Sequence, residues 1–214
     1  LTMLKKNRRL LLQAVVSSLA CMVFAGFIHY EFPVRWVALL GLLVPAFIFS
    51  SNLSSPGDLK KITGEAIHRG RTWLYLLVGS LMGVLVALLY RRYLDISLLP
   101  GSFFFFTLVA ALIGSTEELV FRGFIQEYVR PVNGLLSVVF SSLAHTGYKC
   151  SLFLSPAVPS TVDVWFLAYW TFIVGILFSA LRHFSRSVWP SVAAHALFDI
   201  LVYAEYAKAP WWVW

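Results

Sequence analysis

The chain has 214 residues, of which 59% are hydrophobic and only 13% are charged, and its mean hydropathy is +0.79. Soluble domains are about half apolar and a quarter charged, so this composition excludes an ordinary soluble protein and indicates a multi-pass membrane protein. The net charge of +7 would suit nucleic-acid binding, but the lysines and arginines lie in short clusters between apolar runs, as topology signals do. The sequence contains no nucleic-acid-binding motif, and no nucleic acid is expected as a partner.

Apolar segments of the length that crosses a bilayer, about 20 residues, recur along the chain and predict an all-α bundle of about seven transmembrane helices, within a range of six to eight. They lie at residues 10–29, 36–50, 73–90, 102–122, 134–150, 164–181 and 188–205. The first continues past Cys21, so we expect a membrane span rather than a cleaved signal peptide. The third carries Gly79 and Gly83 in the GxxxG spacing that allows helices to pack closely. We expect residues 1–214 to form a single integral membrane domain.

The basic clusters predict the orientation of this domain in the bilayer. A cytoplasmic N-terminus places KKNRR at 5–9, the polar loop 51–72, the segment 122–130 and RHFSR at 182–186 on the inside, as the positive-inside rule requires. The polar loop is the longest between spans, and we expect part of it to be a helix that lies on the membrane surface. The short chain has no large soluble insertion, which favours a protein of a prokaryotic cell membrane.

Ionisable side chains interrupt three of the predicted spans, although a buried charge without a partner costs several kcal/mol. The fourth span contains Glu117, Glu118 and Arg122 in STEELVFR, the fifth contains His145, and the seventh contains His195 and Asp199 in HALFD. A helix rises about 1.5 Å per residue, which places Glu118, His145 and His195 about 13–18 Å from the same membrane face, near the middle of a core about 30 Å thick. We therefore expect the three spans to share one polar pocket.

The spacing within each span suggests roles for these groups. Glu118 and Arg122 are one helical turn apart, so Arg122 can neutralise Glu118. Glu117 lies about 100° round the helix without that partner, which leaves it free to act as a general base. The alternative is that both glutamates share Arg122 in a purely structural cluster. His195 and Asp199 are also one turn apart, and we expect Asp199 to accept the Nδ1 proton of His195 so that Nε2 faces the pocket.

The absence of other signatures narrows the chemistry. HExxH, GxSxG and GxGD are missing, and Cys21 and Cys150 are too far apart in the sequence to suggest a zinc cluster. Water activated by Glu117 with the help of a histidine, attacking a carbonyl group, fits what remains. We expect no cofactor, and the main alternative within this class is a divalent metal held by Glu117, His145 and His195. A proton-coupled carrier or a non-catalytic membrane scaffold would also place such groups at mid-bilayer.

Three motifs in residues 101–206 resemble those of a known family. EELVFR resembles the EExxxR motif, and HALFD the HxxxN/D motif, of the CAAX protease and bacteriocin-processing (CPBP, also called Abi) membrane proteins. The middle motif of that family is FxxxH, whose histidine corresponds to His145. Ser141 stands at the aromatic position of that motif here, and Phe140 precedes it. Residues 101–206 would therefore form the catalytic core.

The resemblance implies a glutamate-type intramembrane endopeptidase that hydrolyses a peptide bond of a membrane-anchored or C-terminal-tail substrate, either a protein or a peptide. By this resemblance Glu117 is the base that activates water, His145 aligns the water, His195 and Asp199 stabilise the oxyanion, and Glu118 and Arg122 support the site. Members of the family trim prenylated CaaX proteins or act in peptide maturation and bacteriocin self-immunity. An ionised Asp199 would repel an oxyanion, so we expect it to be protonated or to act only through His195.

Overall fold

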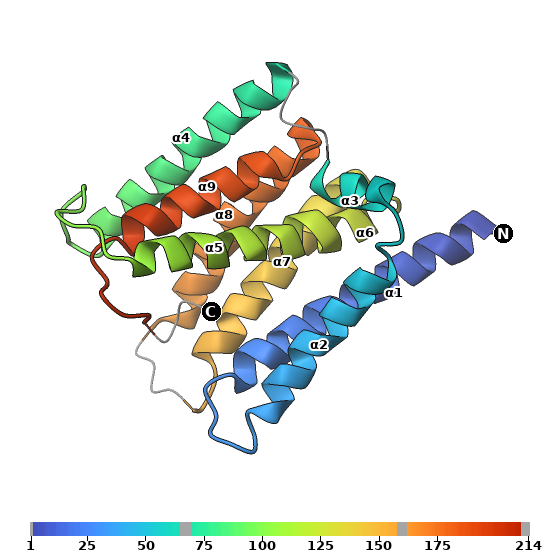
Figure 1. The fold of residues 1–214 in the computed structure, drawn as a ribbon, viewed down its shortest axis with the longest axis horizontal. Helices are drawn as coiled ribbons and strands as arrows, with labels where there is room; N and C mark the ends of the chain where they lie inside the picture. The colour runs from blue at the N-terminus through green and yellow to red at the C-terminus, as the bar shows by residue number, and fades with distance from the viewer. Residues whose placement is uncertain (1, 65–69, 158–161, 211–214) are drawn as a thin grey trace.

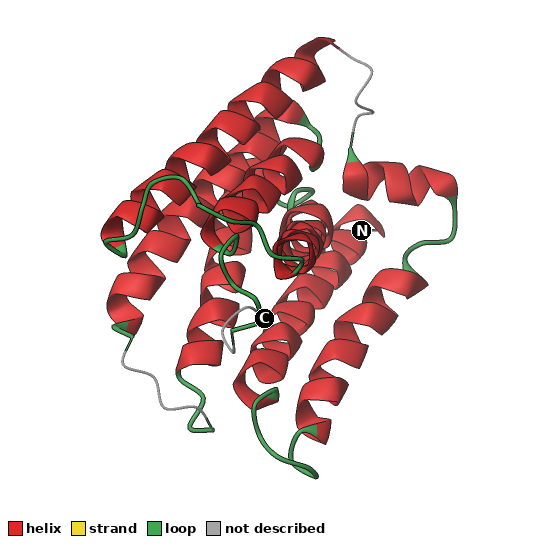
Figure 2. Ribbon diagram, turned by 60° about the vertical axis from the view of Figure 1, so that its left-hand side comes forward, coloured by secondary structure: helices red, strands yellow, loops and turns green. Residues whose placement is uncertain are grey.

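The computed structural model describes residues 2–64, 70–157 and 162–210, and their regular structure is helical. Apart from one isolated bridge between Gly64 and Ser187, these ranges contain no β-structure (Figure 2). The elements are α1 (Thr2–Phe27), α2 (Trp36–Ser51), α3 (Pro56–Thr63), α4 (Gly70–Tyr93), α5 (Phe106–Glu118), the π-helix η1 (Leu119–Ile125), α6 (Gln126–Val129), α7 (Gly134–Phe153), α8 (Val164–Ser185) and α9 (Trp189–Val202). The predicted all-α bundle is confirmed.

All seven predicted segments coincide with helices, but fewer of them are long and apolar enough to cross a membrane alone. Within the described ranges, Lys5–Phe27 of α1, α4 and α8 meet that criterion, and α2 with α3 meets it only as a pair bent by 119°. By length and composition the spans therefore number three, or four with the bent pair. The segment 102–122 falls short because its α-helix gives way to the π-helix at Leu119, and α9 has only 14 residues.

The helices divide into two outer groups with two helices between them (Figure 1). α4, α8 and α9 lie on one side, α1 and α2 lie on the other, and α5 and α7 run between these groups. α5 packs on α9, and α7 packs on both α8 and α1. The two central helices carry Glu117 and His145, so the fold places the predicted site in the interior of the bundle.

The GxxxG glycines fix the helix that carries His195. A Cβ atom added at Gly79 would lie 2.3 Å from the carbonyl oxygen of Pro190, and one added at Gly83 would lie 2.1 Å from that of Ala194. Only glycine allows α4 to approach the backbone of α9 this closely. The predicted close packing is confirmed, and it holds α9 at the residue that precedes His195.

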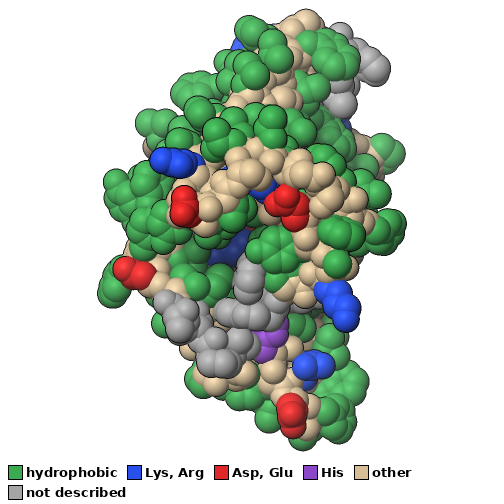
Figure 3. Space-filling model, turned by 90° about the vertical axis from the view of Figure 1, so that its left-hand side faces the viewer, with side chains coloured by type: hydrophobic (Ala, Val, Ile, Leu, Met, Phe, Trp, Pro, Cys, Tyr) green, Lys and Arg blue, Asp and Glu red, His purple; other side chains and the backbone are tan. Residues whose placement is uncertain are grey.

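The exterior of the bundle is apolar and much of its interior is polar. Large hydrophobic side chains are exposed along the long helices, with Trp165 86% exposed, whereas Glu118 and Arg122 are fully buried. Figure 3 shows one face on which apolar side chains predominate and which is hollowed near its middle, with a basic side chain at the bottom of the hollow. A large apolar surface around buried charges is the arrangement expected of a protein in a bilayer.

Candidate active site

The predicted site residues of α5, α7 and α9 meet around one carboxylate. Oε2 of Glu117 lies 3.0 Å from Nε2 of His145 and 4.0 Å from Nε2 of His195. The two imidazole rings are 6.0 Å apart between their centroids. The three spans therefore bring their polar side chains to one place, as expected, although Glu117 and His145 are in direct contact rather than separated by an open pocket.

Lys149 is a partner of Glu117 that sequence reasoning missed. Its Nζ donates a hydrogen bond to Oε1 of Glu117 at 2.6 Å. Lys149 follows His145 by one turn of α7, so both side chains lie on the face of the helix that is turned toward α5. Arg122 pairs instead with Glu118. Among the described residues, Arg122 therefore forms its ion pair with Glu118 and not with Glu117.

Glu118 organises the second half of the site. Its Oε1 lies 3.1 Å from Nη1 of Arg122 and 2.9 Å from Nδ1 of His195. The predicted ion pair between Glu118 and Arg122 is confirmed, and both side chains are fully buried. Removing one partner of such a pair leaves a buried charge uncompensated, at a cost of about 3–5 kcal/mol.

The predicted role of Asp199 toward His195 is wrong. Nδ1 of His195 contacts Glu118, and Oδ2 of Asp199 lies 3.8 Å from Nε2, beyond hydrogen-bonding distance. The reason is geometric, because Asp199 lies one turn further along α9 and reaches only the far edge of the ring. Nδ1, on the opposite edge, faces Glu118 of α5. Nε2 does face Glu117 in the site, as predicted, but Asp199 also lies on this side of the ring.

Gly114 allows α5 to approach α9 at the site. A Cβ atom at this position would lie 2.1 Å from Oδ2 of Asp199 and 2.9 Å from Cδ2 of His195. Gly114 is buried and precedes Glu118 by one helical turn. The glycine therefore determines how closely His195 can approach the two glutamates.

The EExxxR motif spans the change from α-helix to π-helix. α5 ends at Glu118, and Arg122 lies within η1. The hydroxyl of Ser141 donates a hydrogen bond to the carbonyl oxygen of Phe121 in η1 at 2.8 Å, and the Phe121 ring lies 4.8 Å from that of His145. Phe121 thus supplies an aromatic contact to His145, while Ser141, at the aromatic position of the family motif, binds the π-helix. Single π-helical turns are frequent at functional sites.

α8 is a fourth helix that contacts the site, and its contribution was not predicted from the sequence. Nη2 of Arg122 donates to the carbonyl oxygen of Gly175 at 3.4 Å, and its guanidinium lies 5.9 Å from the ring centroid of Phe178. The same ring lies 5.9 Å from that of His195. The segment from Gly175 to Phe178 contains only apolar residues and glycine, so its contact with the site cannot be predicted from the sequence.

The described side chains do not form a metal site. No group of three or more His, Cys, Asp and Glu residues in the described ranges is arranged as metal ligands. Oε1 of Glu117 already accepts a hydrogen bond from Lys149, and Nδ1 of His195 already forms a hydrogen bond with Glu118. A metal ion would need a rearrangement of these contacts before it could bind Glu117 and both histidines.

Comparison with known proteins agrees with the geometry. Residues 99–201 match a family model described as "Rce1-like: Type II CAAX prenyl endopeptidase Rce1-like". The match contains every site residue from Gly114 to Asp199, and it confirms the resemblance inferred from the three motifs. No curated protein and no solved structure matches the chain.

Proposed function

We propose that this chain, which belongs to the CPBP family through its Rce1-like CAAX endopeptidase domain, hydrolyses a peptide bond by means of water activated by Glu117. The family match supports the assignment of the chain as a peptidase that acts within the membrane. The catalytic roles are assigned from one observation. A single carboxylate oxygen of Glu117 faces Nε2 of His145 at 3.0 Å and Nε2 of His195 at 4.0 Å, and these histidines lie on two other helices. A buried carboxylate between two imidazoles suits proton transfer to and from water.

The space between Glu117 and His195 is the proposed position of the water. A separation of 4.0 Å between Oε2 and Nε2 is too long for a direct hydrogen bond, and a water molecule can bridge such a gap. The water would donate one proton to Glu117 as its oxygen attacks the carbonyl carbon of the substrate. The same proton then passes from Glu117 to the leaving amine, and the C–N bond breaks. Glu117 thus acts first as base and then as acid.

His145 is proposed to align the water indirectly, because it holds the carboxylate of Glu117 in position. A carboxylate can only accept hydrogen bonds, so Nε2 of His145 carries the proton in its contact with Glu117. Nδ1 of His145 is buried and has no hydrogen-bond partner among the described residues. It is therefore an acceptor that a water molecule or a substrate N–H group can use.

His195 is proposed to stabilise the oxyanion as an imidazolium. Because its Nδ1–H donates to Glu118, a neutral His195 would present a bare Nε2, which cannot donate to an oxyanion. Carboxylate oxygens of Glu117, Glu118 and Asp199 all lie within 4.0 Å of the ring nitrogens and would stabilise the added charge. Asp199 then acts through His195, or donates a hydrogen bond itself when protonated.

The proposed substrate is a membrane-anchored protein cleaved in its C-terminal tail, with prenylated CAAX proteins as the class to test first. The matched family description and the apolar exterior support this choice, because a lipid-anchored substrate can reach the site from the bilayer. We also propose that the protein lies in a prokaryotic cell membrane with its N-terminal residues on the cytoplasmic side, an orientation that the distribution of basic clusters supports.

The test compares the wild-type chain with Glu117→Gln and a control, Glu31→Gln, which alters an exposed carboxylate between α1 and α2. Each purified protein is mixed with prenylated and unprenylated CAAX peptides, and the products are identified by mass spectrometry. We expect the wild type and the control to cleave, and Glu117→Gln to lose at least about 1,000-fold in rate. Cleavage that persists in Glu117→Gln excludes Glu117 as the base, loss of activity with chelators favours a metal enzyme, and uptake into proteoliposomes without cleavage favours a carrier.

A further inference from the structure

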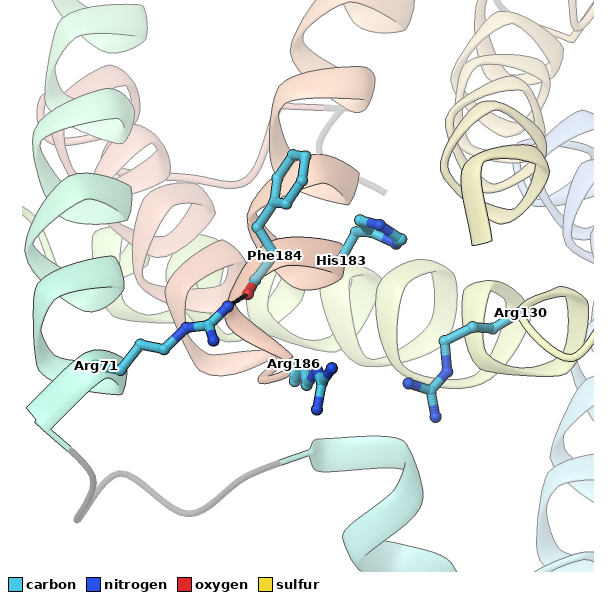
Figure 4. Close-up of a pocket in the computed structure, with 5 residues that line it drawn as sticks. All are labelled: Arg71, Arg130, His183, Phe184 and Arg186. Atoms are coloured by element: carbon cyan, nitrogen blue, oxygen red, sulfur yellow. Dashed lines mark hydrogen bonds between the residues drawn. The ribbon is translucent and has the colours of Figure 1, made fainter. Parts of the chain in front are cut away.

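Basic side chains from four segments surround two adjoining pockets at one end of the bundle, away from the active site. The pockets have volumes of about 340 and 290 Å³ and share Arg130 and Arg186. The Lys and Arg residues that line them are Lys60, Lys61, Arg71, Arg130, Arg182 and Arg186. Figure 4 shows Arg71, Arg130 and Arg186 around the first pocket, with His183 beside them. We call this group of six residues the basic pocket.

The carboxylates of the described residues neutralise only part of the positive charge of the basic pocket. Asp58 pairs with Lys61 at 2.8 Å, and Glu127 pairs with Arg130 at 2.7 Å and with Arg182 at 3.3 Å. These are two carboxylates for six basic groups. Arg71 and Arg186 form no ion pair with a carboxylate within residues 2–64, 70–157 and 162–210. Like charges held this close together repel, and a bound anion would relieve that repulsion.

Arg71 is held in place by the backbone. Its Nη2 donates a hydrogen bond to the carbonyl oxygen of Phe184 at the end of α8 (Figure 4). This contact fixes the guanidinium of α4 next to the last turn of α8. The remaining N–H groups of the guanidinium stay available for a ligand, because an arginine carries five donors.

The backbone of Arg186 is held in a conformation that is unusual for arginine. Arg186 ends α8 with φ 57° and ψ 23°, the left-handed region in which helices commonly place glycine. A bridge between Gly64 and Ser187 and a hydrogen bond from the N–H of Val188 to the carbonyl oxygen of Thr63, 2.9 Å long, hold this turn. A non-glycine residue here costs roughly 1–2 kcal/mol, and such strain is concentrated at functional sites. The presence of arginine at this position therefore indicates a use for its side chain.

The position of the basic pocket relative to the membrane indicates which anion it binds. α4 begins at Gly70 and α8 ends at Ser185, and both helices are long and apolar enough to cross a membrane. The pocket lies where these two helices leave the hydrocarbon, which is the level of lipid phosphates. Phe184 also lines it and is 55% exposed, so its ring can lie against an acyl chain. We infer that the basic pocket binds the phosphate of an anionic phospholipid headgroup.

The test measures lipid binding by the full chain, without any peptide substrate. Native mass spectrometry of protein in phosphatidylcholine nanodiscs, titrated with short-chain phosphatidylglycerol, gives an apparent affinity. The main variant is Arg186→Gly, because glycine is favoured at this left-handed position and the variant should fold at least as well as the wild type. The control is Arg92→Gln, which removes an exposed arginine at the opposite end of α4.

We expect Arg186→Gly to bind phosphatidylglycerol about fivefold more weakly than the wild type, which corresponds to about 1 kcal/mol for one arginine at the membrane surface. Arg92→Gln should bind like the wild type. Unchanged binding by Arg186→Gly, or equal weakening in Arg92→Gln, would overturn the proposal. Inorganic phosphate in nanodiscs of phosphatidylcholine alone separates the two sources of the anion. An equal apparent affinity for inorganic phosphate would assign the pocket to free phosphate and refute the lipid.

Discussion

Replacing Gly114 with alanine should displace the catalytic side chains without removing any of them. The added Cβ would lie 2.1 Å from Oδ2 of Asp199 and 2.9 Å from Cδ2 of His195. Carbon and oxygen atoms that are not bonded normally stay about 3.3 Å or more apart, so the carboxylate of Asp199 must move by roughly 1 Å. The clashing atoms belong to side chains rather than to the backbone, so rotation of these side chains can relieve the clash while the helices stay packed.

The size of the effect follows from this displacement. A misplacement of about 1 Å in a catalytic site commonly costs about 100-fold in rate. Overpacking a well-packed interior costs about 1–3 kcal/mol, and a chain of this size loses roughly 2–4 °C in Tm per kcal/mol. We therefore expect kcat/KM of Gly114→Ala to fall about 100-fold, while the protein remains folded with a moderately lower Tm.

The assay measures cleavage of a CAAX peptide and Tm for the wild type and the variant in the same detergent. Gly26→Ala is the matched control, since a Cβ atom at Gly26 meets nothing within 4 Å. This control should keep both the rate and the Tm of the wild type. Wild-type kcat/KM in Gly114→Ala would refute the reasoning, because it would show that the arrangement of His195 and Asp199 does not limit the reaction.

Three further predictions concern residues around the site and at the end of the bundle. Lys149→Met should lower kcat/KM more than about tenfold, which corresponds to about 1.4 kcal/mol. Lys149→Arg should keep more of the activity, because it retains the positive charge beside the proposed base. Equal rates for the two variants would contradict this prediction. Gly83→Ala should lower the free energy of unfolding in denaturant by about 1–3 kcal/mol, because the added methyl group meets the backbone of α9. An unchanged free energy of unfolding would show that α4 and α9 can separate freely. The backbone N–H of Gly101 and the guanidinium of Arg91 donate to Glu205 and hold its pKa below the ordinary value. A carboxylate with a lowered pKa stabilises the folded state above its unfolded pKa of about 4.3, and this contribution is lost as the pH falls. Glu205→Gln should therefore lower Tm at pH 7, and the difference from the wild type should shrink below about pH 4; a constant difference would exclude this origin.

Much of the site followed from spacing along single helices and from depth in the bilayer. Residues four apart lie on one face, which predicted the pair of Glu118 with Arg122. Counting the helical rise from the ends of the spans placed Glu118, His145 and His195 at one depth. The contacts of Glu118 with His195 and of the adjacent Glu117 with His145 agree with that count. The face on which a residue lies and its depth in the bilayer depend only on the regular geometry of one helix and on the thickness of the membrane.

The contacts that the sequence did not predict depend on how one helix is rotated relative to its neighbour. The partner of Nδ1 in His195 is Glu118 on another helix, although Asp199 is the obvious candidate on its own helix. Lys149 lies near the end of its predicted span, where a lysine is normally explained by the membrane interface, so its position in the sequence does not predict the contact with Glu117. Phe121 reaches His145 because a π-helix changes the angular spacing of residues after Glu118, and no periodicity analysis based on the α-helix includes that change.

The number of spans was also less certain from the sequence than the positions of the helices. The predicted segment 102–122 divides into the α-helix α5 and most of the π-helix η1, and the charged residues lie at that change. α2 contains Pro45 and bends into α3, so the pair forms at most one broken span. Hydropathy identifies apolar stretches, but whether a stretch crosses the bilayer in one piece depends on such breaks.

A double-mutant cycle between Glu117 and His195 tests most directly whether residues of separate helices act on one water molecule. The measurement is kcat/KM for peptide cleavage by Glu117→Ala, His195→Ala and the double variant, each checked for folding by its Tm. If the two residues form one catalytic unit, the double variant should lose about as much activity as the worse single variant. Losses that multiply in the double variant, or a single variant with wild-type activity, would contradict a shared site.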